Sequence, residues 1–145
     1  MKLEWLLWLA SLLPQPVADH VCLATTVYLE ARSEPELGQR AVAEVAMRRL
    51  DAGRWGDTVC AVVNAKGQFA QSIVSPSYQI RNPKAWGKAW HVAGDALHNW
   101  SLPLAQRKLV VPHADHFFAQ NIASPSWRDR PLVAVIGGHS FVRVH

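Results

Sequence analysis

The sequence predicts an α+β fold, mainly helical, in a single domain with a small C-terminal β-hairpin. In the first two thirds of the chain, apolar residues recur at helical spacing in several segments. The last third contains LVAVIGGHSFVRV, two apolar runs that meet at Gly137-Gly138, which is a hairpin signal. The chain has 145 residues, 50% of them hydrophobic, so it is long enough to bury one core.

The N-terminal segment, residues 1–18, differs in character from the main domain predicted over residues 19–145. Residues 5–13, WLLWLASLL, form an apolar run about as long as the core of a signal peptide. This run is too short to span a bilayer as a helix. Two interpretations stay open: a weak export or membrane-tethering signal, or a helix packed on the domain.

The first helix of the main domain is predicted over roughly residues 20–32, with Asp19 as its N-cap. It is apolar almost all round, which is typical of a central, buried helix. Glu30 follows Thr26 by four residues and is followed by Ser33 or Glu34 three or four residues later, so these polar residues share one helical face. This narrow polar seam is expected to face a solvent-filled cleft, or else to be a thin solvated stripe.

A second helix is predicted from about residue 35 to residue 50. Ser33 is its expected N-cap, Pro35 falls in the first turn, and Glu36 takes the capping-box position. Gly53 follows the last apolar residues and is expected to end the helix.

Three further segments complete the first two thirds. Residues 57–64 are apolar and are expected to form one or two helical turns, whereas residues 66–81 have the composition of a loop. Asn82 and Pro83 begin a third clear helix. Trp86, Trp90, Ala93 and Leu97 share one face of this helix.

Residues 108–128 are predicted to form a loop rich in histidine and aromatic residues. The loop contains the segment HADHFFAQ and then PSW, and it leads into the hairpin. His113, Asp115 and His116, with the distant His139, offer the side chains of a metal site, as in a zinc amidase or peptidase. Because their spacing matches no strong zinc motif such as HExxH, we expect neither a metal nor another cofactor.

Composition narrows the class of partner. A net charge of +4 favours polyanionic surroundings such as nucleic acid, anionic lipid or bacterial cell wall. The basic residues are scattered and no nucleic-acid-binding motif accompanies them, so we expect no nucleic-acid partner. Seven tryptophans are compatible with large core residues or with the flat walls of a carbohydrate site.

The chain has two cysteines, Cys22 and Cys60. They form one disulfide in an oxidising compartment, or are small buried hydrophobic residues in a reducing one. The sequence leaves this choice open.

Glu30 is the carboxylate with the clearest setting for acid catalysis. Breaking an acetal link between sugars requires an acid that stays protonated near neutral pH. Burial raises a carboxyl pKa, and so does a like charge one helical turn away, which Glu34 supplies. Glycosidases commonly use a second carboxylate across the cleft. Asp115 and Asp57 are candidates, and no spacing selects either; a single acid suffices if the sugar supplies its own nucleophile.

An ordered series of short sequence blocks runs along the main domain. The blocks are Cys22-Leu23-Ala24, Glu30-Ala31-Arg32 with Glu34, Gly38-Gln39 with Ala41-Val42-Ala43, Thr58-Val59-Cys60 with Val62-Val63, Gly67-Gln68-Phe69, Ala114 to Phe117, Pro125 with Trp127, and Ile136-Gly137 with His139 and Phe141. In this order they resemble the spore-cortex-lytic, cell-wall hydrolase family over about residues 21–143. The chain departs from the family pattern at Leu29, Ser33, Ala70 and Phe118.

The resemblance implies a lysozyme-like fold and a peptidoglycan substrate. It implies that Glu30 is the general acid/base acting on the bond between N-acetylmuramic acid and N-acetylglucosamine. The residues that it implies line or support the glycan cleft are Glu34, Gln68, Phe69, His116 and Trp127.

These observations together predict a peptidoglycan glycosidase, a lytic transglycosylase rather than a simple muramidase. We expect a monomer that acts in the cell envelope, in the periplasm or wall, with weak membrane association through residues 5–13. Its size suits a phage or prophage endolysin. The alternatives are the metal-dependent amidase or peptidase and a non-catalytic wall-binding module that relies on tryptophans and basic charge.

Overall fold

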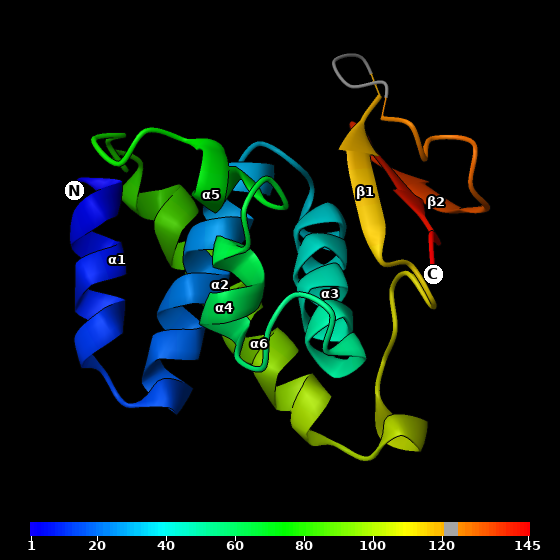
Figure 1. The fold of residues 1–145 in the computed structure, drawn as a ribbon, viewed down its shortest axis with the longest axis horizontal. Helices are drawn as coiled ribbons and strands as arrows, with labels where there is room; N and C mark the ends of the chain where they lie inside the picture. Colours follow the sequence, from blue (N-terminus) through cyan, green and yellow to red (C-terminus); the bar gives the residue numbers. More distant parts are fainter. Residues whose placement is uncertain (121–124) are drawn as a thin grey trace.

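The computed structural model describes residues 1–120 and 125–145 and confirms the mainly helical α+β fold. Figure 1 shows the helices gathered on one side, with the small sheet beside α3 on the other. The helices are α1 (Leu3–Leu12), α2 (Gln15–Ala31), α3 (Glu36–Ala52), α4 (Val59–Asn64), α5 (Ala70–Ile73) and α6 (Pro83–Ser101), with a 3-10 turn at Leu104–Gln106. The strands are β1 (His116–Ala119), β2 (Leu132–Ile136) and β3 (His139–Val142).

Helix α2 is the central element, as its apolar sequence predicts. It packs against all five of the other helices, and residues 21–28 are buried without interruption. The helix begins at Gln15, earlier than predicted, because Pro14 and Pro16 favour the start of a helix and the preceding turn. Asp19 is therefore not its N-cap. The Asp19 carboxylate instead accepts a hydrogen bond from the backbone nitrogen of Cys60 at the start of α4.

The N-terminal apolar run forms α1, which lies against α2. Leu3, Leu6 and Ala10 are the buried residues of α1, and Leu6 and Ala10 belong to the same core cluster as the buried residues of α2. The opposite side of α1 exposes a set of apolar side chains: Trp5, Trp8, Leu9 and Leu12. Across the described residues, no helix has the length and apolarity that a membrane span requires.

Helix α3 follows α2 after a short turn. Its N-cap residue is Pro35, and no side chain caps its first turn, so the prediction that Ser33 caps this helix is wrong. Proline at this position fixes the backbone for helix entry without a capping hydroxyl. Helix α3 ends at Gly53, whose φ of 71° lies in the left-handed region that glycine adopts most readily.

The apolar element over residues 57–64 is α4, capped by the Thr58 hydroxyl, which accepts a hydrogen bond from the nitrogen of Ala61. Helix α4 is also tied covalently to α2. Cys22 and Cys60 form a disulfide with a Cα–Cα distance of 5.2 Å.

The predicted loop over residues 66–81 contains one helical turn, α5, and α6 begins as predicted, with the Asn82 side chain accepting a hydrogen bond from Ala85. The apolar face of α6 is only partly buried. Small residues, Ala89 and Ala93, allow α6 to approach α2 closely, whereas Trp90 remains 38% exposed and stacks on the His20 ring.

The C-terminal sheet has three antiparallel strands in the order β1-β3-β2, one more than the predicted hairpin. The hairpin β2–β3 turns at Gly137-Gly138 as expected. The additional strand β1 comes from the HADHFFAQ segment and pairs Phe117 with Phe141, so this part of the predicted loop is a strand. Residues 121–124 of that predicted loop lie outside the described residues.

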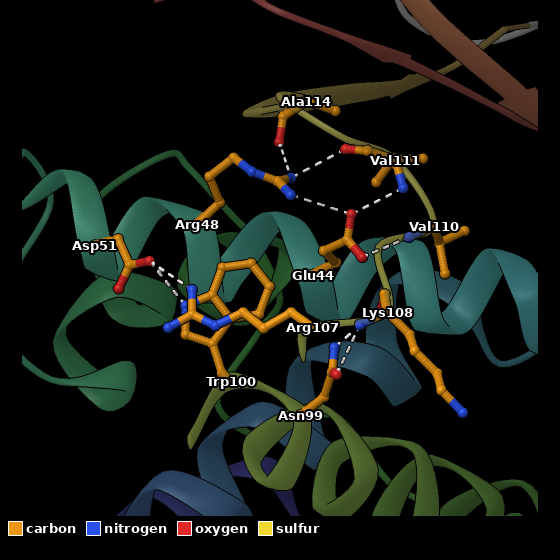
Figure 2. Close-up of polar contacts among 10 residues, drawn as sticks. All are labelled: Glu44, Arg48, Asp51, Asn99, Trp100, Arg107, Lys108, Val110, Val111 and Ala114. Carbon is orange, nitrogen blue, oxygen red and sulfur yellow. Dashed lines mark hydrogen bonds and ion pairs between the residues drawn. The ribbon is translucent and has the colours of Figure 1, made fainter. Parts of the chain in front are cut away.

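A buried ionic contact anchors the segment before β1 to α3 (Figure 2). The Glu44 carboxylate accepts hydrogen bonds from the nitrogens of Val110 and Val111. The Arg48 guanidinium lies 3.2 Å from Glu44 and donates to the carbonyls of Val111 and Ala114. This contact fixes the position at which the chain enters Asp115 and β1.

Candidate active site

Glu30 lies in the last turn of α2, on the polar seam predicted from the sequence. Its Oε1 accepts a hydrogen bond from the backbone nitrogen of Ala70 at 2.5 Å. Burial raises the pKa of the Glu30 carboxyl, although the Ala70 hydrogen bond and the Arg49 charge act in the opposite direction. A carboxyl whose protonated form is favoured is the group that general acid catalysis requires.

Thr26 lies on the polar seam one turn before Glu30 and helps to position Ala70, the hydrogen-bond partner of Glu30. The buried Thr26 hydroxyl donates to Gln71 Oε1 at 2.8 Å, and Gln71 Nε2 donates to Asn64 Oδ1 at 2.8 Å. Gln71 follows Ala70 in α5, so this chain of hydrogen bonds holds α5 against α2. The nitrogen of Ala70 is thereby directed at the acid.

Arg49, from α3, is the basic residue whose charge acts on the Glu30 carboxyl. Its Nε donates to the backbone oxygen of Asp115 at 2.8 Å, and its guanidinium carbon lies 4.8 Å from the ring centres of both Trp55 and Phe69. Burial lowers the pKa of Arg49 to about 10, against the opposing pull of the Asp115 and Glu30 carboxylates. No sequence motif distinguished Arg49 from the other basic residues.

Gln68 and Phe69 reach this region from the turn before α5. The Gln68 side chain is exposed, and its Oε1 accepts a hydrogen bond from Arg49 at 3.3 Å. The Phe69 ring is buried, with its centre 6.0 Å from that of Phe117 in β1. Phe69 is therefore a core residue beside Ala70, whereas Gln68 faces solvent.

His116 and Trp127 lie together beyond Arg49. Their ring centres are 4.7 Å apart in an edge-on contact, and His116 Nδ1 lies 3.0 Å from Asp115 Oδ1. Burial lowers the pKa of His116, and the hydrogen bond to Asp115 opposes this effect. Burial favours a higher pKa for Asp115, but hydrogen bonds from Val144, His116 and His145 outweigh it and lower the pKa.

Glu34, the other acidic residue of the seam, points away from Glu30 toward the sheet. Its carboxylate accepts hydrogen bonds from the nitrogen of Gly138, at 3.1 Å from Oε2, and its Oε1 lies 3.8 Å from His139 Nδ1. Burial raises the Glu30 pKa, as the sequence predicts, whereas the charge of Glu34, the second expected cause, does not contribute to the shift. In this structure Glu34 holds the β2–β3 turn.

The two candidates for a second catalytic carboxylate have other environments. Both oxygens of Asp115 accept hydrogen bonds from the backbone that follows β3, through Val144 and His145. Asp57 is exposed just before α4.

The histidines considered for a metal site also have other environments. Within residues 1–120 and 125–145, no three His, Cys, Asp or Glu side chains converge as metal ligands would. His113 is exposed, and His139 is buried beside Glu34.

Known proteins are similar to this chain in sequence and in fold. The family model described as Cell Wall Hydrolase matches residues 33–142. The spore cortex-lytic enzymes of Oceanobacillus iheyensis and Bacillus cereus are 30% and 29% identical over 126 residues, which is 86% of this chain. This chain spans 41% and 44% of the length of those two relatives.

Two solved structures have the same lysozyme-like arrangement of helices with a small sheet. They are the catalytic domains of the germination-specific lytic transglycosylase SleB from Bacillus anthracis and of the Bacillus cereus SleB protein. Each has a TM-score of 0.66 and 29% sequence identity, and each match covers 86% of this chain. The match covers 93% of the Bacillus anthracis structure and 89% of the Bacillus cereus structure. Since the family model spans most of the sequence and the fold agrees, the chain belongs to the cell wall hydrolase family.

Proposed function

We propose that this protein cleaves the glycan strands of peptidoglycan between N-acetylmuramic acid and N-acetylglucosamine, as a lytic transglycosylase, with Glu30 as general acid/base. The observation that carries the proposal is the setting of Glu30: burial raises its pKa, and the nitrogen of Ala70 holds one of its oxygens. Glu30 precedes the segment that the family model matches, so its role rests on this geometry and on the sequence blocks that resemble the family.

The proposed reaction needs one acid/base. Protonated Glu30 donates its proton to the glycosidic oxygen as the bond from the muramyl C1 breaks. The C6 hydroxyl of the same muramyl residue then attacks C1 and gives its proton to the Glu30 carboxylate. One C–O bond breaks, one forms, no water is consumed, and Glu30 returns to its starting state with a 1,6-anhydro-muramyl product.

The environments of the other carboxylates support this single-acid scheme. Hydrolysis through a glycosyl-enzyme intermediate requires a second carboxylate about 5–5.5 Å from the first. Asp115 and Glu34 are engaged by backbone nitrogens, and Asp57 is exposed before α4. A nucleophile supplied by the substrate removes the need for any of the three.

Muropeptide analysis tests the proposal directly. Purified sacculi are digested with wild type and Glu30→Gln, and the released fragments are identified by mass spectrometry. We expect anhydro-muramyl ends from the wild type and none from the variant. Reducing muramyl ends would indicate a hydrolase, free amino termini would indicate an amidase or peptidase, and unchanged clearing by Glu30→Gln would indicate a wall-binding module.

We also propose weak association with anionic membranes through α1. The exposed side of this helix carries Trp5, Trp8 and Leu12, which are 56%, 65% and 63% exposed. Tryptophan is suited to the membrane–water interface, and the net charge of +4 adds attraction to anionic lipid. Cosedimentation with phosphatidylglycerol vesicles should fall in Trp5→Ser/Trp8→Ser; equal binding by this variant would contradict the proposal.

A further inference from the structure

A hollow of about 240 Å³ lies where the end of α3 meets the residues that follow β3. Its charged lining comprises three arginines and one carboxylate, with two imidazoles: Arg48, Arg54, Arg143, Asp115, His113 and His145. Its volume is below the range of pockets that hold drug-sized ligands, so it suits one carboxylate-bearing amino-acid residue rather than a disaccharide.

The negative groups around this hollow do not balance all of the positive charge of its arginines. Asp115 directs both oxygens at the backbone of Val144 and His145, and Arg48 is engaged by Glu44 and two carbonyls. Arg54 is exposed and makes no hydrogen bond or ion pair with any residue in 1–120 or 125–145.

Arg143 is also exposed, and its Nε donates to the backbone oxygen of His145. The C-terminal end of α3, close to Arg54, contributes about half a negative charge. Because Glu44 neutralises Arg48, the guanidiniums of Arg54 and Arg143 face one lining carboxylate, that of Asp115. The remaining positive charge exceeds the half charge of the dipole, so the hollow favours an anion.

The hollow and the proposed acid lie on two sides of Arg49. Trp55 lines the hollow and packs on the Arg49 guanidinium, which also packs on Phe69. Phe69 directly precedes Ala70, the hydrogen-bond partner of Glu30. A substrate held at Glu30 therefore has the hollow beside it, two ring contacts away.

We propose that this hollow binds a carboxylate of the stem peptide that muramic acid carries, while the glycan strand occupies the site of Glu30. The proposal rests on the proposed function. Apart from the stem peptide, the sugars of a glycan strand are largely uncharged, so the peptide carboxylates are the groups that an arginine pocket selects. Guanidinium binds carboxylate in a planar, bidentate geometry, and Arg54 and Arg143 are the side chains exposed to do so.

The test compares two substrates prepared from sacculi free of teichoic acid: peptide-bearing glycan strands, and strands stripped of peptide by an amidase, in which only the lactyl carboxylate directly attached to the sugar remains. Release of anhydro-muramyl ends gives kcat and KM for each. We expect the wild type to show a KM about tenfold lower on peptide-bearing strands, the scale of one charge-assisted contact. Arg54→Gln/Arg143→Gln should raise that KM about tenfold, without a matching change on stripped strands.

A control variant removes the same charge elsewhere. Lys84→Gln/Lys88→Gln alters two exposed lysines of α6 outside the hollow and should keep the wild-type preference. Equal KM values of the wild type on both substrates would overturn the pocket, and so would an equal effect of the arginine and lysine variants. Absence of anhydro-muramyl ends from the wild type would overturn the proposed function itself, and the pocket with it.

Discussion

The Oε1 atom of Glu30 lies 2.5 Å from the backbone nitrogen of Ala70, a residue 40 positions later in the chain. Because this N–H donates to Oε1, the proton of the neutral acid belongs on Oε2. The contact is held by helix packing, since Thr26 of α2 binds Gln71 of α5 one residue further on. The orientation of the acid is thus built into the α2–α5 contact, and its two oxygens have different roles.

Replacing Glu30 by glutamine should separate activity from stability. Loss of the proton donor is expected to lower kcat by about 10²–10⁴-fold. The melting temperature at pH 7 should rise, by about 2–4 °C for each kcal/mol gained in a chain of this size. The reason is that burial disfavours the ionised carboxylate in the folded state, and glutamine carries no charge.

The size of this effect on stability depends on pH. The pKa of Glu30 is raised by folding, so its contribution to stability is fully present below its ordinary pKa and is lost as pH rises through the folded pKa. Thermal melts of wild type and Glu30→Gln from pH 3 to pH 8 should therefore diverge with increasing pH. Glu4→Gln, at an exposed residue of α1, should follow the wild type throughout. A Glu30→Gln protein that melts below wild type at pH 7 would contradict the expectation.

Arg49 should set the alkaline limit of activity. Its positive charge favours the ionised form of Glu30 and so lowers the pKa of the acid. In Arg49→Gln that pull is lost, the Glu30 pKa rises further, and the alkaline limb of kcat/KM should move to higher pH even though the overall rate falls. Arg49→Lys keeps the charge and should leave the limb near its wild-type position. A limb that moves to lower pH in Arg49→Gln would refute the assignment.

The local elements of the fold could be predicted because their signals are local. The apolar surface of α2, the Asn82 cap of α6 and the glycine turn at Gly137 all depend on residues a few positions apart. The errors at helix starts have a common cause. Asp19 and Ser33 resemble N-caps by residue type, but the prolines nearby, Pro14 and Pro35, determine where the helices begin.

The features that escaped prediction depend on tertiary packing. Strand β1 is four residues long and pairs with β3, which follows about twenty residues later, so no local pattern marks it. The sequence spacing places Glu30 and Glu34 on one helical face. In the structure, Glu34 accepts a hydrogen bond from Gly138 of the β2–β3 turn, whereas Glu30 accepts one from Ala70. Arg49 and Gln71 reach the site only because α3 and α5 pack on α2, and that arrangement has no signature in a single sequence.

Reduction of the Cys22–Cys60 disulfide should destabilise the protein substantially. The bond closes a loop with a sequence separation of 38 and joins α2 to α4. The chain-entropy estimate for such a loop is about 4 kcal/mol, which corresponds to a fall of roughly 10 °C in melting temperature. Calorimetry with and without reductant measures the change. Cys22→Ala/Cys60→Ala should melt low and be insensitive to reductant; a wild type that is equally insensitive would disprove the contribution.

The contact between Glu34 and the β2–β3 turn should make Gly137 difficult to replace. Gly137 has a φ of 57°, and a Cβ at this position would collide with Glu34 Oε2. Gly53 also has a positive φ, of 71°, but a Cβ there meets nothing within 4 Å. We therefore expect Gly53→Ala to cost about 1–2 kcal/mol, from backbone strain alone, and Gly137→Ala to cost at least about 1 kcal/mol more, from strain and collision together.

A double-mutant cycle between residues 34 and 137 separates these two effects. Glu34→Ala alone should cost about 1 kcal/mol, because the nitrogen of Gly138 loses its acceptor. In the Glu34→Ala background the collision with the carboxylate is gone and only a tight contact with Pro35 Cδ, at 3.1 Å, remains, so the cost of Gly137→Ala should fall close to that of Gly53→Ala. Urea unfolding of the four proteins gives the coupling, which we expect to be at least about 1 kcal/mol. Strict additivity would mean that the turn relaxes away from Glu34, and that this carboxylate does not hold the sheet against the start of α3.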